Sequence, residues 1–75
     1  MGLNDLNTCL MNRLRVARAE RNLSQEDMGR LAGVTRQTIS AIENGEYNPS
    51  ALLALRLARA LDKPFQDLFY LEEKS

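Results

Sequence analysis

The sequence predicts a small all-α domain of five short helices. Serine or threonine stands before three amphipathic segments, at Ser24, Thr35 and Ser50, where its hydroxyl can accept a hydrogen bond from the free amides of a helix start. Glycine follows two of these segments, at Gly33 and Gly45, and it suits the left-handed turn that ends a helix. The 75 residues are 44% hydrophobic and 27% charged, which is ordinary for one globular domain.

The first helix is expected over residues 12–21. Leu14 and Ala17 fall on one face at helical spacing, and Leu10 lies one turn earlier. Asn22 follows as a left-handed stop, a role that asparagine shares with glycine. Residues 1–11 are expected to form an N-terminal extension or a short strand.

A second helix is expected over residues 24–33. The Ser24 hydroxyl and the Asp27 carboxylate can each accept from the other's backbone amide, which is a capping box with aspartate in place of glutamate. Met28, Leu31 and Ala32 form its expected buried stripe.

A third helix is expected over residues 35–45, with Thr35 as its N-cap and with Ile39 and Ile42 on its apolar face. Only the three residues Ala-Gly-Val separate it from the preceding helix. Two helices joined by such a short turn containing glycine predict a helix-turn-helix motif over about residues 24–44.

Gly29 lies inside the second helix, where glycine costs about 1 kcal/mol relative to alanine. Two interpretations stay open. The third helix approaches the backbone closely at this point, or the glycine is simply tolerated.

The fourth and fifth helices are expected from residue 51 and from residue 64. Pro49 bars a continuing helix through its neighbour, and Pro64 suits the first position of the last helix. Phe65, Leu68 and Phe69 have helical spacing there. The fourth helix has leucines on more than one face, at Leu52, Leu53, Leu55, Leu57 and Leu61.

Composition argues against an enzyme. The chain has no histidine and one cysteine, Cys9, so nucleophile–base pairs and the usual metal ligands are lacking. No glycine-rich phosphate loop is present. No apolar run approaches the ~20 residues that span a membrane, and the first residues do not form a secretory leader. We expect no catalytic site, metal or cofactor, no membrane, and a cytoplasmic protein.

The front of the helix expected over residues 35–45 has side chains suited to reading DNA bases. Arginine pairs with guanine and glutamine with adenine, while serine and threonine serve several bases. Free amides at a helix start also favour phosphate. Gln25, at the matching start of the second helix, is a candidate for a second phosphate. Because the net charge is zero, a basic surface must come from charges placed on one face. The candidate readers are Arg36, Gln37, Ser40 and Ala41.

A resemblance to the Cro/CI-type (XRE) family of bacterial and phage transcriptional regulators is carried by LSQEDMGRLAGVTRQTISAIENG, followed by YNPS. It covers roughly residues 12–71, and it is most similar to the minimal, single-domain members. It implies a λ-repressor-like domain over residues 12–71, with an acidic tail at 72–75. Departures from the family pattern occur at Ala17, Asn22 and Gly29, none of them among the candidate readers.

The resemblance also implies roles for individual residues. Gln25 matches a phosphate-binding glutamine, and Arg18 and Glu43 match a structural ion pair. The base-facing positions are matched by Arg36, Gln37, Ser40 and Ala41. The phosphate-facing edge is matched by Thr35 and Thr38. The loop that grips the second DNA strand is matched by Asn44, Tyr47 and Asn48.

These observations lead us to expect a sequence-specific double-stranded DNA-binding regulator, a repressor that binds a palindromic operator as a homodimer and has no small-molecule ligand. We expect it to be bacterial, archaeal or phage-encoded and associated with the nucleoid. Two alternatives stay open: an antitoxin of a toxin–antitoxin pair, and an interaction module without DNA binding.

A dimer needs a contact surface, and a core this small does not obviously need every leucine. We expect the two-fold interface at the end of the fourth helix, the turn after it and the start of the fifth, with Leu57, Leu61, Asp62, Pro64 and Phe65. We also expect residues 9–11 to pair with residues 69–71 as a small two-stranded antiparallel sheet.

Overall fold

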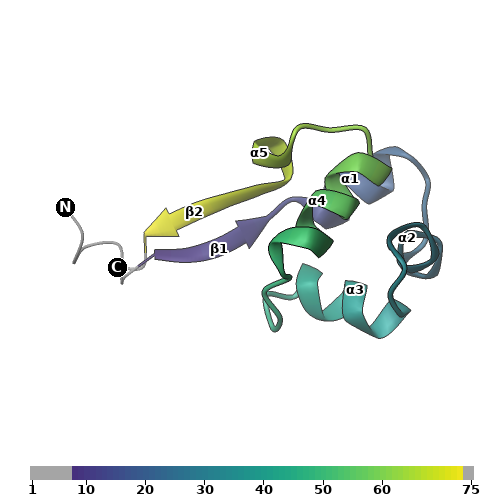
Figure 1. Ribbon diagram of the computed structural model, residues 1–75, viewed down its shortest axis with the longest axis horizontal. Helices are drawn as coiled ribbons and strands as arrows, with labels where there is room; N and C mark the ends of the chain where they lie inside the picture. The colour runs from purple at the N-terminus through teal and green to yellow at the C-terminus, as the bar shows by residue number, and fades with distance from the viewer. Residues whose placement is uncertain (1–7, 74–75) are drawn as a thin grey trace.

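Five helices and a two-stranded sheet make up the structure, a computed structural model that describes residues 8–73 (Figure 1). The helices are α1 (Leu14–Glu20), α2 (Gln25–Ala32), α3 (Arg36–Glu43), α4 (Ala51–Ala60) and α5 (Phe65–Leu68). The strands are β1 (Thr8–Asn12) and β2 (Phe69–Glu73). This architecture confirms the expected fold class. No helix among these residues is long and apolar enough to cross a membrane.

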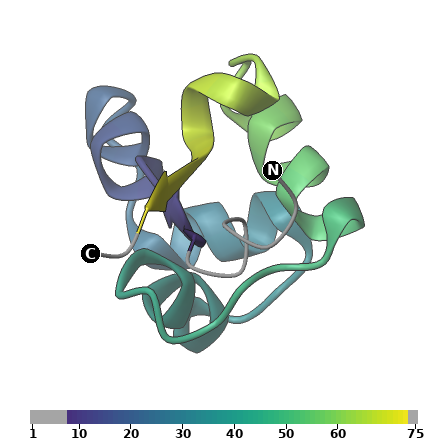
Figure 2. The ribbon, with the colours of Figure 1, turned by 90° about the vertical axis from the view of Figure 1, so that its left-hand side faces the viewer.

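The two strands form a ribbon that projects from one side of the helical body (Figure 1). They are antiparallel, with Leu10 opposite Leu71 and Met11 opposite Tyr70. The expected sheet between residues 9–11 and 69–71 is therefore confirmed. The first strand is longer than expected by one residue at each end, and the second is longer by two residues at its C-terminal end. Seen from the tip of the ribbon, α1 and α4 lie on opposite sides of it (Figure 2).

Local signals in the sequence produce the helix ends. The hydroxyls of Ser24, Thr35 and Ser50 each accept a hydrogen bond from the backbone amide three residues later. Gly33 and Asn22 have positive φ angles of 78° and 56°. Both are therefore the left-handed residues that the sequence predicted.

The core is assembled from all five helices. Ala17, Ala32 and Phe69 are almost completely buried, and Leu10 packs against the core from β1. Seven large side chains have essentially no exposure: Leu14, Met28, Ile39, Ile42, Leu57, Leu61 and Leu68.

Two expectations about burial are wrong. The Leu31 side chain is 58% exposed, because the buried stripe of α2 consists of Met28, Gly29 and Ala32. Leu57 and Leu61 are completely buried within the single chain. They fill the monomer core, so they do not supply a surface for a second copy.

The chain ends also differ from expectation. Helix α1 begins at Leu14, because Asn12 belongs to β1. The side-chain oxygen of Asn12 accepts a hydrogen bond from the Leu14 amide at 3.1 Å. Leu10 is a strand residue, not a helical one. Pro64 is the N-cap of α5, not its first residue, and α5 ends at Leu68 as Phe69 turns to extended backbone. Residues 72–73 of the expected tail lie in β2, while residues 1–7 and 74–75 lie outside the described residues.

Gly29 is explained by a close backbone approach. A Cβ atom at this position would lie 2.7 Å from the Val34 carbonyl oxygen and 3.3 Å from the Arg36 nitrogen. Both atoms belong to the segment that leads from the turn into α3. The first of the two interpretations of this glycine therefore holds, with the turn and the start of α3 as the element that approaches.

Candidate nucleic-acid interface

The position of α3 is fixed from its inner side. Ile39 and Ile42 are completely buried, so the opposite side of the helix faces solvent. Arg36 and Gln37 are exposed there, and Ser40 is half-buried. The side chains of Arg36 and Gln37 have no hydrogen bond or ion pair within residues 8–73. A free guanidinium and a free amide therefore stand together at the start of a helix.

The N-terminal edge of α3 is ordered by two threonines. The Thr35 hydroxyl accepts from the Thr38 amide at 3.2 Å, and the two hydroxyls lie 3.0 Å apart. No acidic residue occupies the first turn of α3. The positive end of its helix dipole is therefore available to an anion. The first turn of α2 contains Glu26 and Asp27, so an anion is less favoured there.

The loop after α3 folds back against it. The amides of Glu46 and Tyr47 both donate to the Ala41 carbonyl, at 2.9 and 3.3 Å. This places Tyr47 beside α3, and Tyr47 and Asn48 are both exposed. A groove of about 460 Å³ runs between α3, this loop and α4, and it is lined by Val34, Gln37, Thr38, Ala41, Tyr47 and Leu53.

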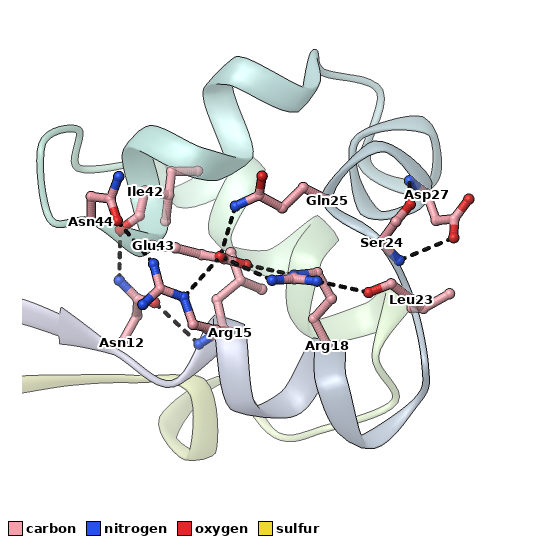
Figure 3. Close-up of polar contacts among 11 residues, drawn as sticks. Asn12, Arg15, Arg18, Leu23, Ser24, Gln25, Asp27, Ile42, Glu43 and Asn44 are labelled. Carbon is pink, nitrogen blue, oxygen red and sulfur yellow. Dashed lines mark hydrogen bonds and ion pairs between the residues drawn. The ribbon is translucent and has the colours of Figure 1, made fainter.

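Glu43, at the end of α3, lies at the centre of a polar network (Figure 3). Arg18 of α1 binds it twice, with Nε 2.7 Å from Oε2 and Nη2 3.3 Å from Oε1. The Arg18 Nη1 atom also donates to the Leu23 carbonyl at 2.8 Å. The Glu43 side chain has no exposure and that of Arg18 has 16%. The ion pair is therefore largely shielded from water.

Two more side chains bind the same carboxylate. The Gln25 amide nitrogen donates to Glu43 Oε1 at 3.1 Å, and Arg15 Nε lies 3.4 Å from the same oxygen. Arg15 also donates from Nη2 to the side-chain oxygen of Asn44 at 2.9 Å. Gln25, expected to hold a phosphate, thus binds a buried carboxylate directly, and Asn44, expected to help grip the second DNA strand, is joined to it through Arg15.

Arg15 was missed in the sequence. Its signal was present, because Arg15 and Arg18 stand three residues apart and therefore share one face of a helix. Asn12 was missed as well. Its side-chain nitrogen donates to the Ile42 carbonyl at 2.9 Å, which ties the end of β1 to the end of α3.

The charge state of the network follows from these contacts. Burial by itself raises the pKa of the Glu43 carboxyl. The hydrogen bonds that Glu43 accepts from Arg18, Gln25 and Arg15 more than offset this, so its pKa lies below the ordinary value. The carboxylate is therefore ionised at neutral pH and available to all its donors.

A family model described as Helix-turn-helix (HTH_3) matches residues 14–68, which is most of the chain. The chain belongs to the Cro/CI-type (XRE) helix-turn-helix family. It is therefore a transcriptional regulator with a helix-turn-helix DNA-binding domain, in which α2 and α3 form the motif.

Relatives of this XRE-family chain have the same description. It is 46% identical over 66 residues to the uncharacterized HTH-type transcriptional regulator YgzD of Bacillus subtilis, covering 88% of this chain and 100% of that protein. It is 44% identical over 64 residues to the uncharacterized HTH-type transcriptional regulator MJ0272 of Methanocaldococcus jannaschii, covering 85% of this chain and 97% of that protein.

Two solved structures resemble this XRE-family domain. The restriction-modification controller protein C.AhdI of Aeromonas hydrophila is 38% identical, with a TM-score of 0.70 over 73% of this chain and 80% of its own. The P22 c2 repressor, solved in complex with a synthetic operator, is 30% identical, with a TM-score of 0.70 over 72% of this chain and 82% of its own.

Only part of the expected dimer surface is exposed in this XRE-family domain. Asp62, Pro64 and Phe65 lie on the surface around the turn between α4 and α5, whereas Leu57 and Leu61 do not. The Phe65 side chain is 40% exposed and stacks on Phe69 with ring centroids 5.4 Å apart. An apolar contact here must therefore be centred on Phe65.

Proposed function

We propose that this chain is a repressor that binds a palindromic operator as a homodimer, with α3 of each protomer in the major groove. The observation that carries the proposal is the pair of exposed side chains Arg36 and Gln37 at the start of α3. An arginine side chain that has no partner within residues 8–73 is available for the two acceptors of a guanine, and a neighbouring glutamine suits adenine. The P22 c2 repressor, a structural relative that was solved in complex with a synthetic operator, supports operator binding by this chain.

In this proposal, other side chains position the protein without reading bases. Thr35 and Thr38 border the N-terminal end of α3, while Tyr47 and Asn48 lie on the loop after it. We assign these four residues to the phosphates on either side of the major groove, because phosphate contacts set the register of a reading helix. Ser40 and Ala41 lie further along α3 and have shorter side chains. We assign them to base contacts as well.

Arg36→Ala is expected to weaken binding to the selected operator by ~1–3 kcal/mol and to lower discrimination at one base pair of each half-site. The operator is first selected from random DNA, and affinities are then measured by gel shift for the operator and for unrelated DNA. Arg56→Ala is the matched control, because Arg56 is an exposed arginine of α4 that also lacks a partner within residues 8–73. Equal losses of Arg36→Ala on operator and unrelated DNA would show that Arg36 does not read a base.

The homodimer has a geometric basis. Two reading helices must enter successive major grooves about 34 Å apart, and two-fold symmetry of the protein then matches a palindromic operator. One α3 helix offers few base contacts, so a single protomer would discriminate poorly. With Leu57 and Leu61 in the core, we assign the interface to Asp62, Pro64 and Phe65.

Sedimentation equilibrium at micromolar concentration is expected to show a dimer for the wild type and a shift towards monomer for Phe65→Ala. The reason is that Phe65 supplies the largest apolar side chain of the assigned surface. Leu71→Ala removes another exposed apolar side chain, on β2, and is expected to remain dimeric. A monomeric wild type, or a Phe65→Ala variant that dimerises and binds the operator normally, would contradict this interface.

A further inference from the structure

Asn44 is the C-cap of α3, and its side-chain amide has two chemically different sides. The oxygen can only accept hydrogen bonds, and the nitrogen can only donate them. A DNA phosphate has acceptor oxygens and no donors. An asparagine therefore binds phosphate only if its nitrogen is turned outward, and a free side chain in solution has no reason to prefer that orientation.

Arg15 sets this orientation. A guanidinium has five donors and no acceptor, so the Asn44 atom facing it must be the oxygen. The structure has this arrangement, with Arg15 Nη2 2.9 Å from Asn44 Oδ1 (Figure 3). The Asn44 nitrogen has no partner within residues 8–73, and the residue is exposed. The side of Asn44 left for a ligand is its donor side.

Arg15 is in turn held by Glu43. Its Nε atom lies 3.4 Å from Glu43 Oε1, the oxygen that also accepts from Gln25 at 3.1 Å. A carboxylate can only accept, so it must face the nitrogen of Gln25, which keeps a second N–H for another acceptor. One buried carboxylate thus fixes which way two amide side chains face, Gln25 directly and Asn44 through Arg15.

We propose that Arg15 is a positioning residue for DNA binding: it turns Asn44 so that the amide nitrogen meets a backbone phosphate. This role rests on the proposed function. In it, the guanidinium acts through Asn44 and does not itself neutralise a phosphate. That distinction is measurable, because each phosphate neutralised by a cation adds about 0.9 to the slope of log K against log salt concentration.

The experiment measures operator affinity at several salt concentrations for Arg15→Ala, Asn44→Ala and the double variant. Asn44→Ala is expected to weaken binding tenfold or more, the scale of one hydrogen bond to a charged group. Arg15→Ala is expected to weaken binding by a smaller factor, because Asn44 keeps its donor and loses only its fixed orientation. The double variant is expected to lose no more than Asn44→Ala alone, because Arg15 acts only through Asn44. The salt slope is expected to equal that of the wild type in all three.

Asn44→Asp supplies an independent readout. It keeps an oxygen for Arg15 but replaces the donor by a second acceptor, so it is expected to weaken binding more than Asn44→Ala. Thermal unfolding controls for folding. The Arg15 side chain is 60% exposed, and Glu43 keeps its ion pair with Arg18 when Arg15 is removed. Arg15→Ala is therefore expected to melt close to the wild-type temperature, because a largely solvated cation adds little stability.

The outcomes separate this role from the function beneath it. A wild type that selects no operator overturns the proposed function and this role together. If the wild type binds, three results overturn the role of Arg15 alone: wild-type affinity of Arg15→Ala, additive losses in the double variant, or a salt slope reduced by about 0.9.

Discussion

Glu43→Gln is expected to lower the free energy of unfolding by ~3–5 kcal/mol, the usual cost of removing one partner from a buried ion pair. Arg18 is the reason, because its largely buried guanidinium would lose the only counter-charge that it has among residues 8–73 and would keep only hydrogen bonds. Urea unfolding followed by circular dichroism measures the change. Glu46→Gln is the matched control, because Glu46 is an exposed acid whose side chain has no partner within residues 8–73.

The same carboxylate gives the protein a specific acid sensitivity. Its pKa in the folded state lies below the ordinary value of 4.5. A group with a lowered folded pKa adds stability that is complete above the unfolded pKa and is lost as pH falls through the folded pKa. The difference in stability between wild type and Glu43→Gln is therefore expected to shrink below about pH 4.5. A difference that stays constant down to pH 2, or a Glu43→Gln variant as stable as wild type at pH 7, would exclude a stabilising pair.

Gly29→Ala is expected to destabilise the domain by ~1–3 kcal/mol, the range for an overpacked site. In an unconstrained helix the same change would add about 1 kcal/mol of stability, so the sign of the effect is the test. The new Cβ would lie 2.7 Å from the Val34 carbonyl oxygen, and backbone atoms cannot move aside as a side chain can. Relief would require the turn and α3 to shift away from α2.

Gly33→Asn is the control for Gly29→Ala. Gly33 has a positive φ of 78°, but no atom lies within 4 Å of the position where its Cβ would be. Asn22 already adopts a similar conformation in this chain, so asparagine is expected to be tolerated at position 33 with a small loss. A Gly29→Ala variant more stable than wild type would show that the close approach is not a constraint.

The parts of the fold that the sequence predicted depend on neighbouring residues. The caps at Ser24, Thr35 and Ser50 bind amides three residues away, and Gly33 needs only its own φ angle. Such signals are complete within one turn of chain. The helix order and the helix-turn-helix motif follow from them directly.

The sequence-based predictions that were wrong concern burial, which depends on the neighbour that covers a residue. Helical spacing made Leu31 as suitable for burial as Met28. The side of α2 that faces the core contains Gly29, which the turn and the start of α3 approach closely, and Leu31 lies outside that side. A glycine adds nothing to an apolar pattern, so the sequence did not show this orientation. Leu57 and Leu61 were misassigned for a related reason, because the size of the core depends on packing between distant elements.

The candidate site also contains a part that could be predicted from local sequence and a part that could not. The outward positions of Arg36 and Gln37 follow from the spacing of Ile39 and Ile42, so the reading side of α3 was predictable. The contact between Arg15 and Asn44 joins residues 29 positions apart, and no local pattern predicts it. The side chains that orient other side chains are thus the ones that only the three-dimensional structure identifies.

The ribbon has a consequence for the order of folding. Its outermost pair joins residues 8 and 73, almost the greatest sequence separation that the chain allows, whereas the helix-turn-helix motif is built from contacts within about 20 residues. Distant pairings carry the larger loop-closure cost and contribute late in folding. We therefore expect the helical body to form first and β1 to close onto β2 afterwards. Weakening the ribbon should then mainly speed unfolding and leave the folding rate nearly unchanged.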